Sequence, residues 1–309
     1  MNALVPTQSD PPQPPPRQPR NLQGLLAYSM QARGNAPPQE ALHPLSPQDR
    51  QWLSEALSSC TVNVVEEMNK AIQILKEQQN DVETYERALD NLCDYVDNAD
   101  VSNDFHKIGG FTVFPSLLHS EHRTLRSKSA NLLAELTQNN PYCQERALDL
   151  QPALLKLISS DPCQEVRVKA LYALSSHGYV LANTASCLRD YPPSLEPFLQ
   201  HDGLSALLCA LQSASDKLRI KAAFLLSSLC SQNPQVRVQV HKMGMVEQLT
   251  ALLQSEGQPH EHLLSALLAL VRDHPGSLEE CRRPHLRLRE TKILNVMITH
   301  NDIRYLLTT

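Results

Sequence analysis

One amphipathic pattern recurs along the chain, in which basic residues are followed by apolar residues at helical spacing. It reads LRSKSANLLAE at 125–135, VRVKALYALSS at 166–176, LRIKAAFLLSS at 218–228 and PHEHLLSALLA at 259–269. In the third copy the apolar residues recur at intervals of three and four, at Leu218, Ala222, Leu225 and Leu226. This period predicts an α-helix with one buried face, repeated four times.

The spacing around these helices is regular. A turn residue stands 15 positions before each helix anchor, in the pairs Gly110 and Leu125, Gln151 and Val166, Gly203 and Leu218, and Gly244 and Pro259. Three copies end at an asparagine or histidine followed by proline, at Pro141, Pro234 and Pro275. A period of ~40 residues made only of helices is typical of armadillo and HEAT repeats. We therefore predict an all-α, armadillo-like helical repeat solenoid, with YERALDNLCDYVDN at 85–98 as a further copy.

One repeat is longer than the others. The step from Val166 to Leu218 is 52 residues, whereas the two neighbouring steps are 41. The stretch HGYVLANTAS at 177–186 contains glycine and β-branched residues, which are poor helix formers. We interpret it as a loop inserted at the end of a long helix; an error in the sequence is the alternative, and the residues do not decide between the two.

The N-terminal region has a different composition. Eleven of the 22 prolines lie in the first 47 residues, which predicts a disordered Pro-rich arm over 1–45. Within it, NLQGLLAYSM at 21–30 is either a transient helix or a short motif that folds on a partner. We assign the remaining domains as capping helices at 46–83, repeats at 84–275 and a divergent C-terminal cap at 276–309. The motif residues are Leu22, Leu25 and Leu26.

Composition narrows the function class. The net charge of −5 and the pI near 6.2 argue against a nucleic-acid partner. The apolar stretches are shorter than the ~20 residues that a membrane span needs. Eight scattered cysteines without a C-x-x-C pair indicate reduced thiols. We therefore expect a monomer in the cytoplasm, with the nucleus as a second compartment, and no membrane partner.

The sequence offers no motif for catalysis. It contains neither a phosphate-binding G-x-x-x-x-G-K-[ST] loop nor a G-x-S-x-G serine. HSEH at 119–122 and HEH at 260–262 have no further metal ligands at a suitable spacing. We therefore predict a protein that is not an enzyme and that uses no cofactor or metal.

The helix register instead predicts a binding face. One column of the repeats reads Lys128, Lys169, Lys221 and His262, and the next reads Asn131, Tyr172, Phe224 and Ser265. Lysine near a helix start opposes the helix dipole, so its recurrence suggests a site for an acidic or hydrogen-bonding protein surface on the concave side. The alternative is that the lysines are solvated and the aromatic residues belong to the core. A further column, Arg126, Arg167 and Arg219, is expected in packing between repeats or at the rim.

Several segments also resemble one family. They are RNLQGLL at 20–26, RQWLSEA at 50–56, DNADVSNDF at 97–105, MGMVEQLTALL at 243–253, PHEHLLSALLALV at 259–271 and EECRRP at 279–284. Together with the repeats they resemble the Hsp-seventy-binding protein 1 (Fes1) family, from about residue 20 to 286. These proteins are armadillo-like nucleotide exchange factors of the seventy-kilodalton heat-shock chaperones. After Leu286 the resemblance ends.

The resemblance implies a function and part of a site. It implies that the concave face binds the ATPase domain of the chaperone and promotes ADP release, and that the N-terminal arm helps to release a bound client. Lys221 and Phe224 match positions at which the family contacts the chaperone. Lys128, Asn131, Lys169, Tyr172 and His262 are added by the column argument. An armadillo scaffold that binds an extended peptide is the alternative, although its inner ladder of Trp and Asn is missing here.

Overall fold

The computed structural model describes residue 51 and residues 63–77, 80–176, 195–255, 260–286 and 288. Internal contacts divide the chain into two units, Met1–Glu67 and Met68–Thr309. In the described ranges every regular element is a helix. The predicted arm with Leu22, Leu25 and Leu26, the insertion at 177–186 and most of the predicted divergent end lie outside them, so these assignments and the domain boundaries stay predictions.

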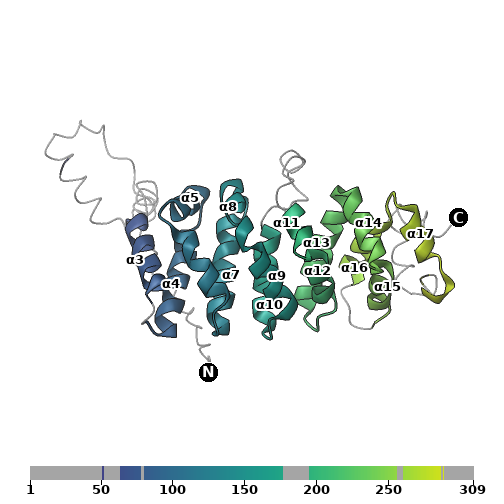
Figure 1. Cartoon of the computed structure of the whole chain (residues 1–309), viewed down its shortest axis with the longest axis horizontal. Helices are drawn as coiled ribbons and strands as arrows, with labels where there is room; N and C mark the ends of the chain where they lie inside the picture. The colour runs from purple at the N-terminus through teal and green to yellow at the C-terminus, as the bar shows by residue number, and fades with distance from the viewer. Residues whose placement is uncertain are drawn as a thin grey trace, which may run out of the picture. The chain divides into compact units, whose positions relative to one another are not determined.

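The second unit consists of repeats of three helices (Figure 1). Before them come α3 (Val64–Lys76), which begins in the first unit, and α4 (Val82–Tyr95). The first repeat contains α5 (Ala99–Lys107), η1 (Gly110–Val113) with α6 (Phe114–Leu118), and α7 (Arg123–Thr137). The second contains α8 (Pro141–Arg146), η2 (Leu148–Leu150), α9 (Gln151–Ser160) and α10 (Gln164–Ser176). The third contains α11 (Leu195–Gln200), α12 (Gly203–Leu211) and α13 (Asp216–Gln232). The fourth contains α14 (Pro234–Lys242), α15 (Met245–Gln254) and α16 (His260–Val271), and α17 (Pro275–Cys281) and η4 (Pro284–Leu286) follow.

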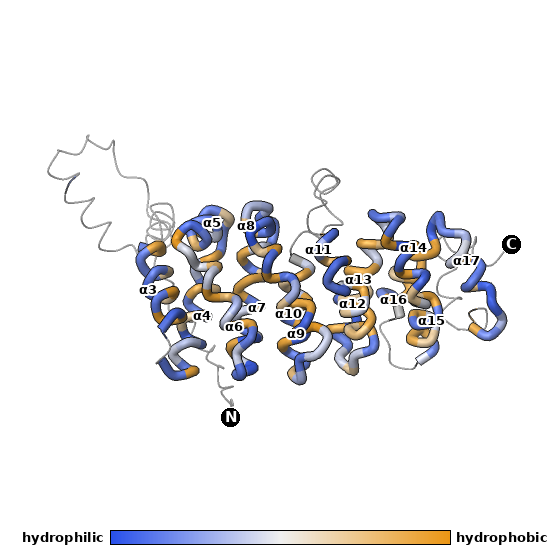
Figure 2. Tube along the Cα trace, in the orientation of Figure 1, coloured by the Kyte–Doolittle hydropathy of each residue, from blue (hydrophilic) through white to orange (hydrophobic). Residues whose placement is uncertain are grey.

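The predicted core of the third helices is confirmed. Consecutive third helices pack on one another from α4 through α7, α10 and α13 to α16. Leu218, Ala222, Leu225 and Leu226 are all buried. Burying one leucine side chain contributes about 1.5–3 kcal/mol relative to exposure, so the buried leucines of these helices stabilise the stack. Hydrophobic segments accordingly gather along the middle of the row, and many turns at its edges are hydrophilic (Figure 2).

Proline starts the helices that follow α7, α13 and α16, where the sequence predicted that three copies end. Pro141, Pro234 and Pro275 each open a helix, where the missing amide hydrogen has no helical acceptor to lose. Asn140 caps one of these helices, because its side-chain oxygen accepts a hydrogen bond from the Cys143 amide. Asn139 precedes this cap with a positive φ of 54°, which turns the chain out of α7. The Asn-Pro and His-Pro pairs therefore mark the points at which one helix ends and the next begins.

Glycine begins the second helix of two repeats because a ring occupies the space of its side chain. A Cβ on Gly203 would lie 2.3 Å from a ring carbon of Phe198, and one on Gly110 would lie 2.4 Å from a ring carbon of Phe105. Both phenylalanines are fully buried and come from the preceding first helix. The pair Phe-x4-Gly thus fixes how closely the first helix approaches the second.

Replacing Gly203 by alanine is expected to lower the free energy of unfolding by about 1–3 kcal/mol, as overpacking of a closed core does. The buried Phe198 ring cannot move aside without displacing its neighbours. Urea unfolding followed by circular dichroism measures the change. Ser205→Ala, at an exposed position of the same helix, should leave stability nearly unchanged. Equal stability of the two variants would contradict this account of the glycine.

Among the described residues, no helix is long and apolar enough to cross a membrane.

Candidate partner-binding site

The predicted site residues lie on successive third helices of the second unit. We call the set the third-helix ladder; it comprises Lys128, Asn131, Lys169, Tyr172, Lys221, Phe224 and His262. The helices that hold them, α7, α10, α13 and α16, pack in that order. The ladder therefore follows the stacking direction, as the column argument predicted. Whether it lines a concave surface stays a prediction.

Each lysine of the ladder contacts the preceding third helix, with α4 taking that place for α7. The Lys128 ammonium lies 2.5 Å from the Asp90 carboxylate of α4. Lys169 donates a hydrogen bond of 2.7 Å to the side-chain oxygen of Asn131. The Lys221 nitrogen lies 4.8 Å from the centre of the Tyr172 ring, in a cation–π contact.

The partner of the lysine differs from one helix to the next: it is a carboxylate for Lys128, an amide for Lys169 and an aromatic ring for Lys221. Lys128 is therefore neutralised by its neighbour, whereas Lys169 and Lys221 have no acid among the partners just described. Burial, and after it the charge of Lys169, lowers the pKa of Lys221. Positive charge thus concentrates between α10 and α13, where an acidic group of a partner would gain most.

Two aromatic residues flank this charge. Phe224 follows Lys221 by three residues on α13 and keeps 43% of its surface exposed, so it does not belong to the core. Tyr172 is half-buried, and its hydroxyl donates to the Gln138 side chain at 3.2 Å. Burial, followed by the nearby Glu135 carboxylate, raises the pKa of Tyr172. The exposed ring of Phe224 is of a residue type that is enriched at protein interfaces.

The end of the ladder on α16 is less charged. His262 is half-buried there. Helices α13 and α16 contact each other through Ser227 and Ser265, whose hydroxyl oxygens are 3.1 Å apart. The part of the ladder on α10 and α13 therefore carries the lysines without a described acid partner and the exposed ring.

The dipole argument for the lysines was wrong. Lys128, Lys169 and Lys221 are each the sixth residue of their helix, in the second turn, where the dipole has little effect. Lys128 moreover has an intramolecular acid partner in Asp90. Recurrence of lysine alone is thus weaker support for a binding face than the sequence suggested, and the stronger support is that the described partners of Lys169 and Lys221 are an amide and a ring rather than acids. Asp90 was missed, although it precedes Lys128 by the same 38 residues that separate Asn131 from Lys169.

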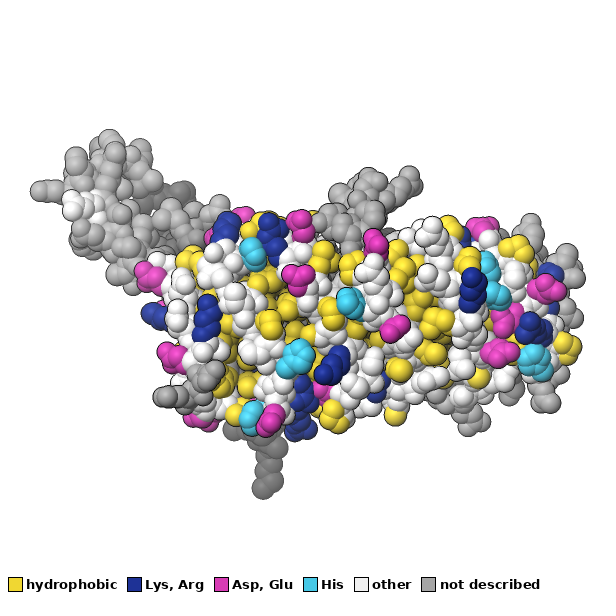
Figure 3. Space-filling model, viewed as in Figure 1, with side chains coloured by type: hydrophobic (Ala, Val, Ile, Leu, Met, Phe, Trp, Pro, Cys, Tyr) yellow, Lys and Arg dark blue, Asp and Glu magenta, His cyan; other side chains and the backbone are white. Residues whose placement is uncertain are grey.

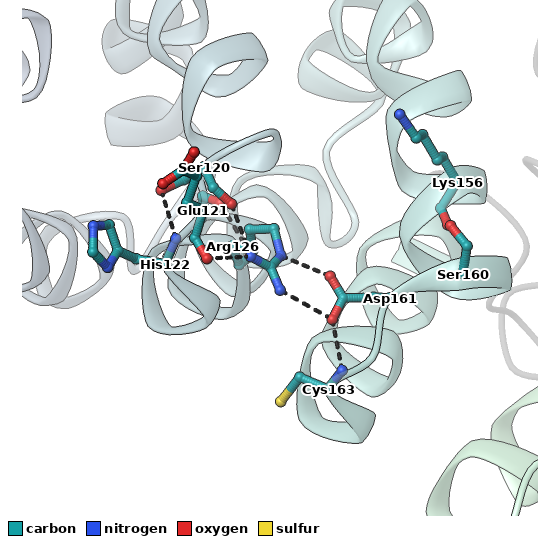
Figure 4. Close-up of polar contacts among 9 residues, drawn as sticks. Ser120, Glu121, His122, Arg126, Lys156, Ser160, Asp161 and Cys163 are labelled. Carbon is teal, nitrogen blue, oxygen red and sulfur yellow. Dashed lines mark hydrogen bonds and ion pairs between the residues drawn. The ribbon is translucent and has the colours of Figure 1, made fainter.

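Two members of the predicted arginine column, Arg126 and Arg167, join repeats as expected, whereas Arg219 contacts Ser213 and Asp216 of its own repeat. Arg126 of α7 makes a two-point ion pair with Asp161, which lies between α9 and α10, at 2.6 and 3.2 Å (Figure 4). The same guanidinium donates to the carbonyl oxygens of Ser120 and Glu121, after α6. Arg167 donates to the Cys209 carbonyl of the next repeat. These arginines bind the C-terminal ends of second helices, where the carbonyls lack helical donors.

The buried thiols are poor nucleophiles. Burial raises the pKa of Cys93 and Cys143 to about 11 and that of Cys230 and Cys281 to about 12. At neutral pH they stay protonated, and the thiolate is the reactive form. The described cysteines are all free; Cys143, Cys230 and Cys281 are buried, whereas Cys209 is exposed.

A second cluster joins α14 to α17. The His274 ring accepts a hydrogen bond from the Ser277 amide and so caps α17. The Ser277 hydroxyl lies between the two histidine rings, 2.8 Å from Nδ1 of His274 and 3.2 Å from Nδ1 of His241. The buried Glu280 carboxylate lies 3.0 Å from Nδ1 of His241. Burial, then the charges of His241 and Arg237, lowers the pKa of His274.

We expect the protein to be less stable at about pH 5 than at neutral pH, partly because of His274. The unfolded chain binds a proton at this histidine near its ordinary pKa of about 6.5, whereas the folded protein binds it only at lower pH. The stabilisation is therefore present above the unfolded pKa and is lost as the pH falls through the folded pKa. Thermal unfolding at several pH values measures this loss. His274→Asn keeps a capping side chain and should reduce the pH dependence; an unchanged dependence would contradict this assignment.

Family comparisons cover most of the chain. The profile described as "Nucleotide exchange factor Fes1" matches residues 22–105, and the "SIL1/FES1/HPBP1 C-terminal domain" matches 101–212 and 196–284. Hsp70-binding protein 1 of Macaca fascicularis is 38% identical over 293 residues, which cover 89% of this chain and 77% of the relative. The Homo sapiens protein of that name is 38% identical over 292 residues, covering 89% and 78%. Hsp70 nucleotide exchange factor FES1 of Mycosarcoma maydis is 33% identical over 149 residues, covering 48% and 36%.

Solved structures share the fold. An engineered protein superposes with a TM-score of 0.61 at 18% identity, covering 77% of this chain and 92% of its own. A designed armadillo repeat protein in complex with the peptide (KR)4 gives a TM-score of 0.57 at 15% identity, covering 73% and 95%. At these identities the likeness shows the armadillo fold alone, which confirms the predicted fold class. The profiles and the 38% identity over most of the chain show that this protein belongs to the family of Fes1 and Hsp70-binding protein 1.

Proposed function

We propose that this protein binds the ATPase domain of an Hsp70 chaperone through the third-helix ladder and promotes the release of ADP. The observation that carries the proposal is membership of a family whose relatives are named for Hsp70 binding and nucleotide exchange. The ladder supplies a suitable surface, because Lys169 and Lys221 lack an acid partner in the ladder and Phe224 is exposed beside them.

The mechanism requires only differential binding. The nucleotide domain of a chaperone samples a closed form that holds ADP tightly and an open form that holds it weakly. A rigid surface that binds only the open form must weaken ADP binding by the factor by which ADP weakens its own binding. A 100-fold effect needs about 2.7 kcal/mol of differential binding, which a few well-placed side chains can supply. No residue of the solenoid has to react chemically.

Timing the release of labelled ADP from the isolated Hsp70 ATPase domain tests the proposal. We expect the full chain to accelerate release at least tenfold at saturating concentration, which corresponds to about 1.4 kcal/mol. Binding is reciprocal: excess ADP should weaken the binding of this protein to the ATPase domain by the same factor by which this protein weakens the binding of ADP. Tight binding to the ATPase domain without any change in the rate of ADP release would show that this protein binds the chaperone but is not an exchange factor. Absence of binding would refute both steps.

A further inference from the structure

The lysines of the third-helix ladder that have no described acid partner lie on neighbouring helices. Lys169 of α10 donates to a side-chain amide, and Lys221 of α13 lies over the Tyr172 ring. Lys128 of α7 differs, because Asp90 of α4 neutralises its charge. Over the face drawn in Figure 3, by comparison, Lys and Arg side chains are interspersed with Asp and Glu side chains. Positive charge on the ladder is therefore concentrated on α10 and α13.

An acid on α7 lies beside these cations. Glu135 follows Asn131 by four residues and precedes Gln138 by three, so the three side chains share one face of the helix. Asn131 accepts a hydrogen bond from Lys169 at 2.7 Å, and Gln138 accepts one from the Tyr172 hydroxyl at 3.2 Å. Both neighbours of Glu135 thus contact α10, and Glu135 is half-buried between them. Its carboxylate therefore lies at the junction of α7 and α10.

A second acid lies one helix earlier. Asp94 follows Asp90 by one turn on α4, and the ion pair of Asp90 shows that this face of α4 meets α7. Burial, and after it the charges of Glu135, Asp90 and Asp94, raises the pKa of Cys93 to about 11. The cation of α4, Arg87, precedes Asp94 by almost two turns. Beside its neutralised ion pair, this end of the ladder thus has an acid on each of its two helices.

The sign of the charge changes near Tyr172. The Lys221 nitrogen lies 4.8 Å from the centre of the Tyr172 ring, whereas the hydroxyl of the same residue points to the α7 face that carries Glu135. The residues that correspond to Glu135 on α13 and α16 carry no charge; they are Ser228 and Ala269. The ladder is therefore acidic on α4 and α7 and basic on α10 and α13.

We propose that the ladder binds a surface of the Hsp70 ATPase domain whose charges are separated in the opposite sense. Glu135 meets a cation of the chaperone, and Lys169 and Lys221 meet an acid. The inference rests on the proposed function, because it names the chemistry of the surface that the ladder binds. A chaperone surface of one sign would place like charges opposite each other at one end of the ladder, which weakens binding. The charge separation thus selects the orientation of the partner.

Replacing Glu135 by glutamine tests the proposal through the sign of the effect. Glutamine keeps the size of the side chain and an acceptor for the Tyr172 hydroxyl, but it removes the charge. We expect the dissociation constant of the complex between the full chain and the ATPase domain to rise about threefold or more at low salt. Against a uniformly acidic partner, loss of this carboxylate would instead tighten the complex. Tighter or unchanged binding in calorimetry would therefore refute the proposal.

The dependence on salt separates a charge effect from a packing defect. Salt screens the attraction between Glu135 and a cation of the partner, so the difference between the glutamine variant and the unmodified protein should shrink as salt is raised. A defect in packing at the junction of α7 and α10 would persist at high salt. A difference of constant size would thus assign Glu135 a structural role and contradict the proposed contact.

Exchanging two charges reverses the polarity without changing the net charge. Glu135→Lys combined with Lys221→Glu should weaken the complex about 100-fold or more, because both contacts become repulsive. Lys107→Asp with Asp104→Lys is the matched control, since this exposed pair lies 2.7 Å apart on α5, outside the ladder. It should change the dissociation constant by less than about twofold. Equal losses in the two double variants would count against the polarity, and Glu135→Gln decides if the reversed variant does not fold.

The proposed function and the charge separation fail in different ways. If the unmodified protein binds the ATPase domain without accelerating ADP release, the exchange activity is refuted, and calorimetry of the Glu135 variant still tests the polarity. If exchange is normal but Glu135→Gln tightens the complex, the polarity alone is refuted. Absence of any binding by the unmodified protein refutes both.

Discussion

Replacing Arg126 by alanine is expected to lower the free energy of unfolding by about 3–5 kcal/mol, the cost of breaking a buried ion pair from one side. Asp161 keeps only 3% of its side chain exposed and Arg126 only 12%, so water cannot replace the missing guanidinium. The variant leaves the carboxylate uncompensated and also frees the carbonyls of Ser120 and Glu121. The whole effect should appear in stability, because Arg126 lies outside the third-helix ladder.

Controls on the same helix separate this pair from a general effect of charge. Arg123→Ala removes an exposed arginine from the first turn of α7 and should change stability by less than about 0.5 kcal/mol. Arg126→Ala combined with Asp161→Asn removes the uncompensated charge and should recover part of the loss. Asp161 also accepts from the Cys163 amide, and asparagine can keep that bond. If the double variant is no more stable than Arg126→Ala, the buried charge is not the cause.

The repeat pattern made most of the fold predictable. The 15-residue interval from Gly203 to Leu218 spans one short helix and one turn, and a helix start and a buried leucine stand at its two ends. Proline at 141, 234 and 275 marked where a third helix ends and another helix begins, because proline cannot continue the previous one. Local chemistry thus determines the elements, and repetition determines how they stack.

The contacts between repeats were harder to predict. The order of the ladder residues follows from the helix register. The ion pair that neutralises Lys128 does not, because Asp90 reaches Lys128 only once α4 packs on α7. Asp161 lies in a turn, so no periodic pattern places it against Arg126. The phenylalanine behind Gly203 likewise becomes visible only when the first and second helices are packed. Sequence periodicity gives the direction of a side chain, whereas its partner depends on the geometry of the neighbouring repeat.

Combining Phe224→Ala with Lys221→Glu is expected to abolish the acceleration of ADP release. Truncation of a central aromatic anchor costs about 2 kcal/mol or more at an interface, and reversal of a half-buried charge that faces an acidic partner adds to it. Together they should weaken the complex with the ATPase domain by at least 100-fold, which is about 2.7 kcal/mol. Calorimetry and labelled-ADP release measure the two effects separately.

The same double variant should fold normally, and this distinguishes a binding role from a structural one. Phe224 is 43% exposed, so its ring contributes little to the core. Burial, and after it the charge of Lys169, lowers the pKa of Lys221, so replacing this lysine by glutamate removes its repulsion with Lys169. Val238→Ala with Lys242→Glu is the matched control, since Val238 is 40% exposed and both residues lie on α14, away from the ladder. Normal exchange in the ladder variant, or an equal loss in the control, would show that the chaperone binds another face of the solenoid.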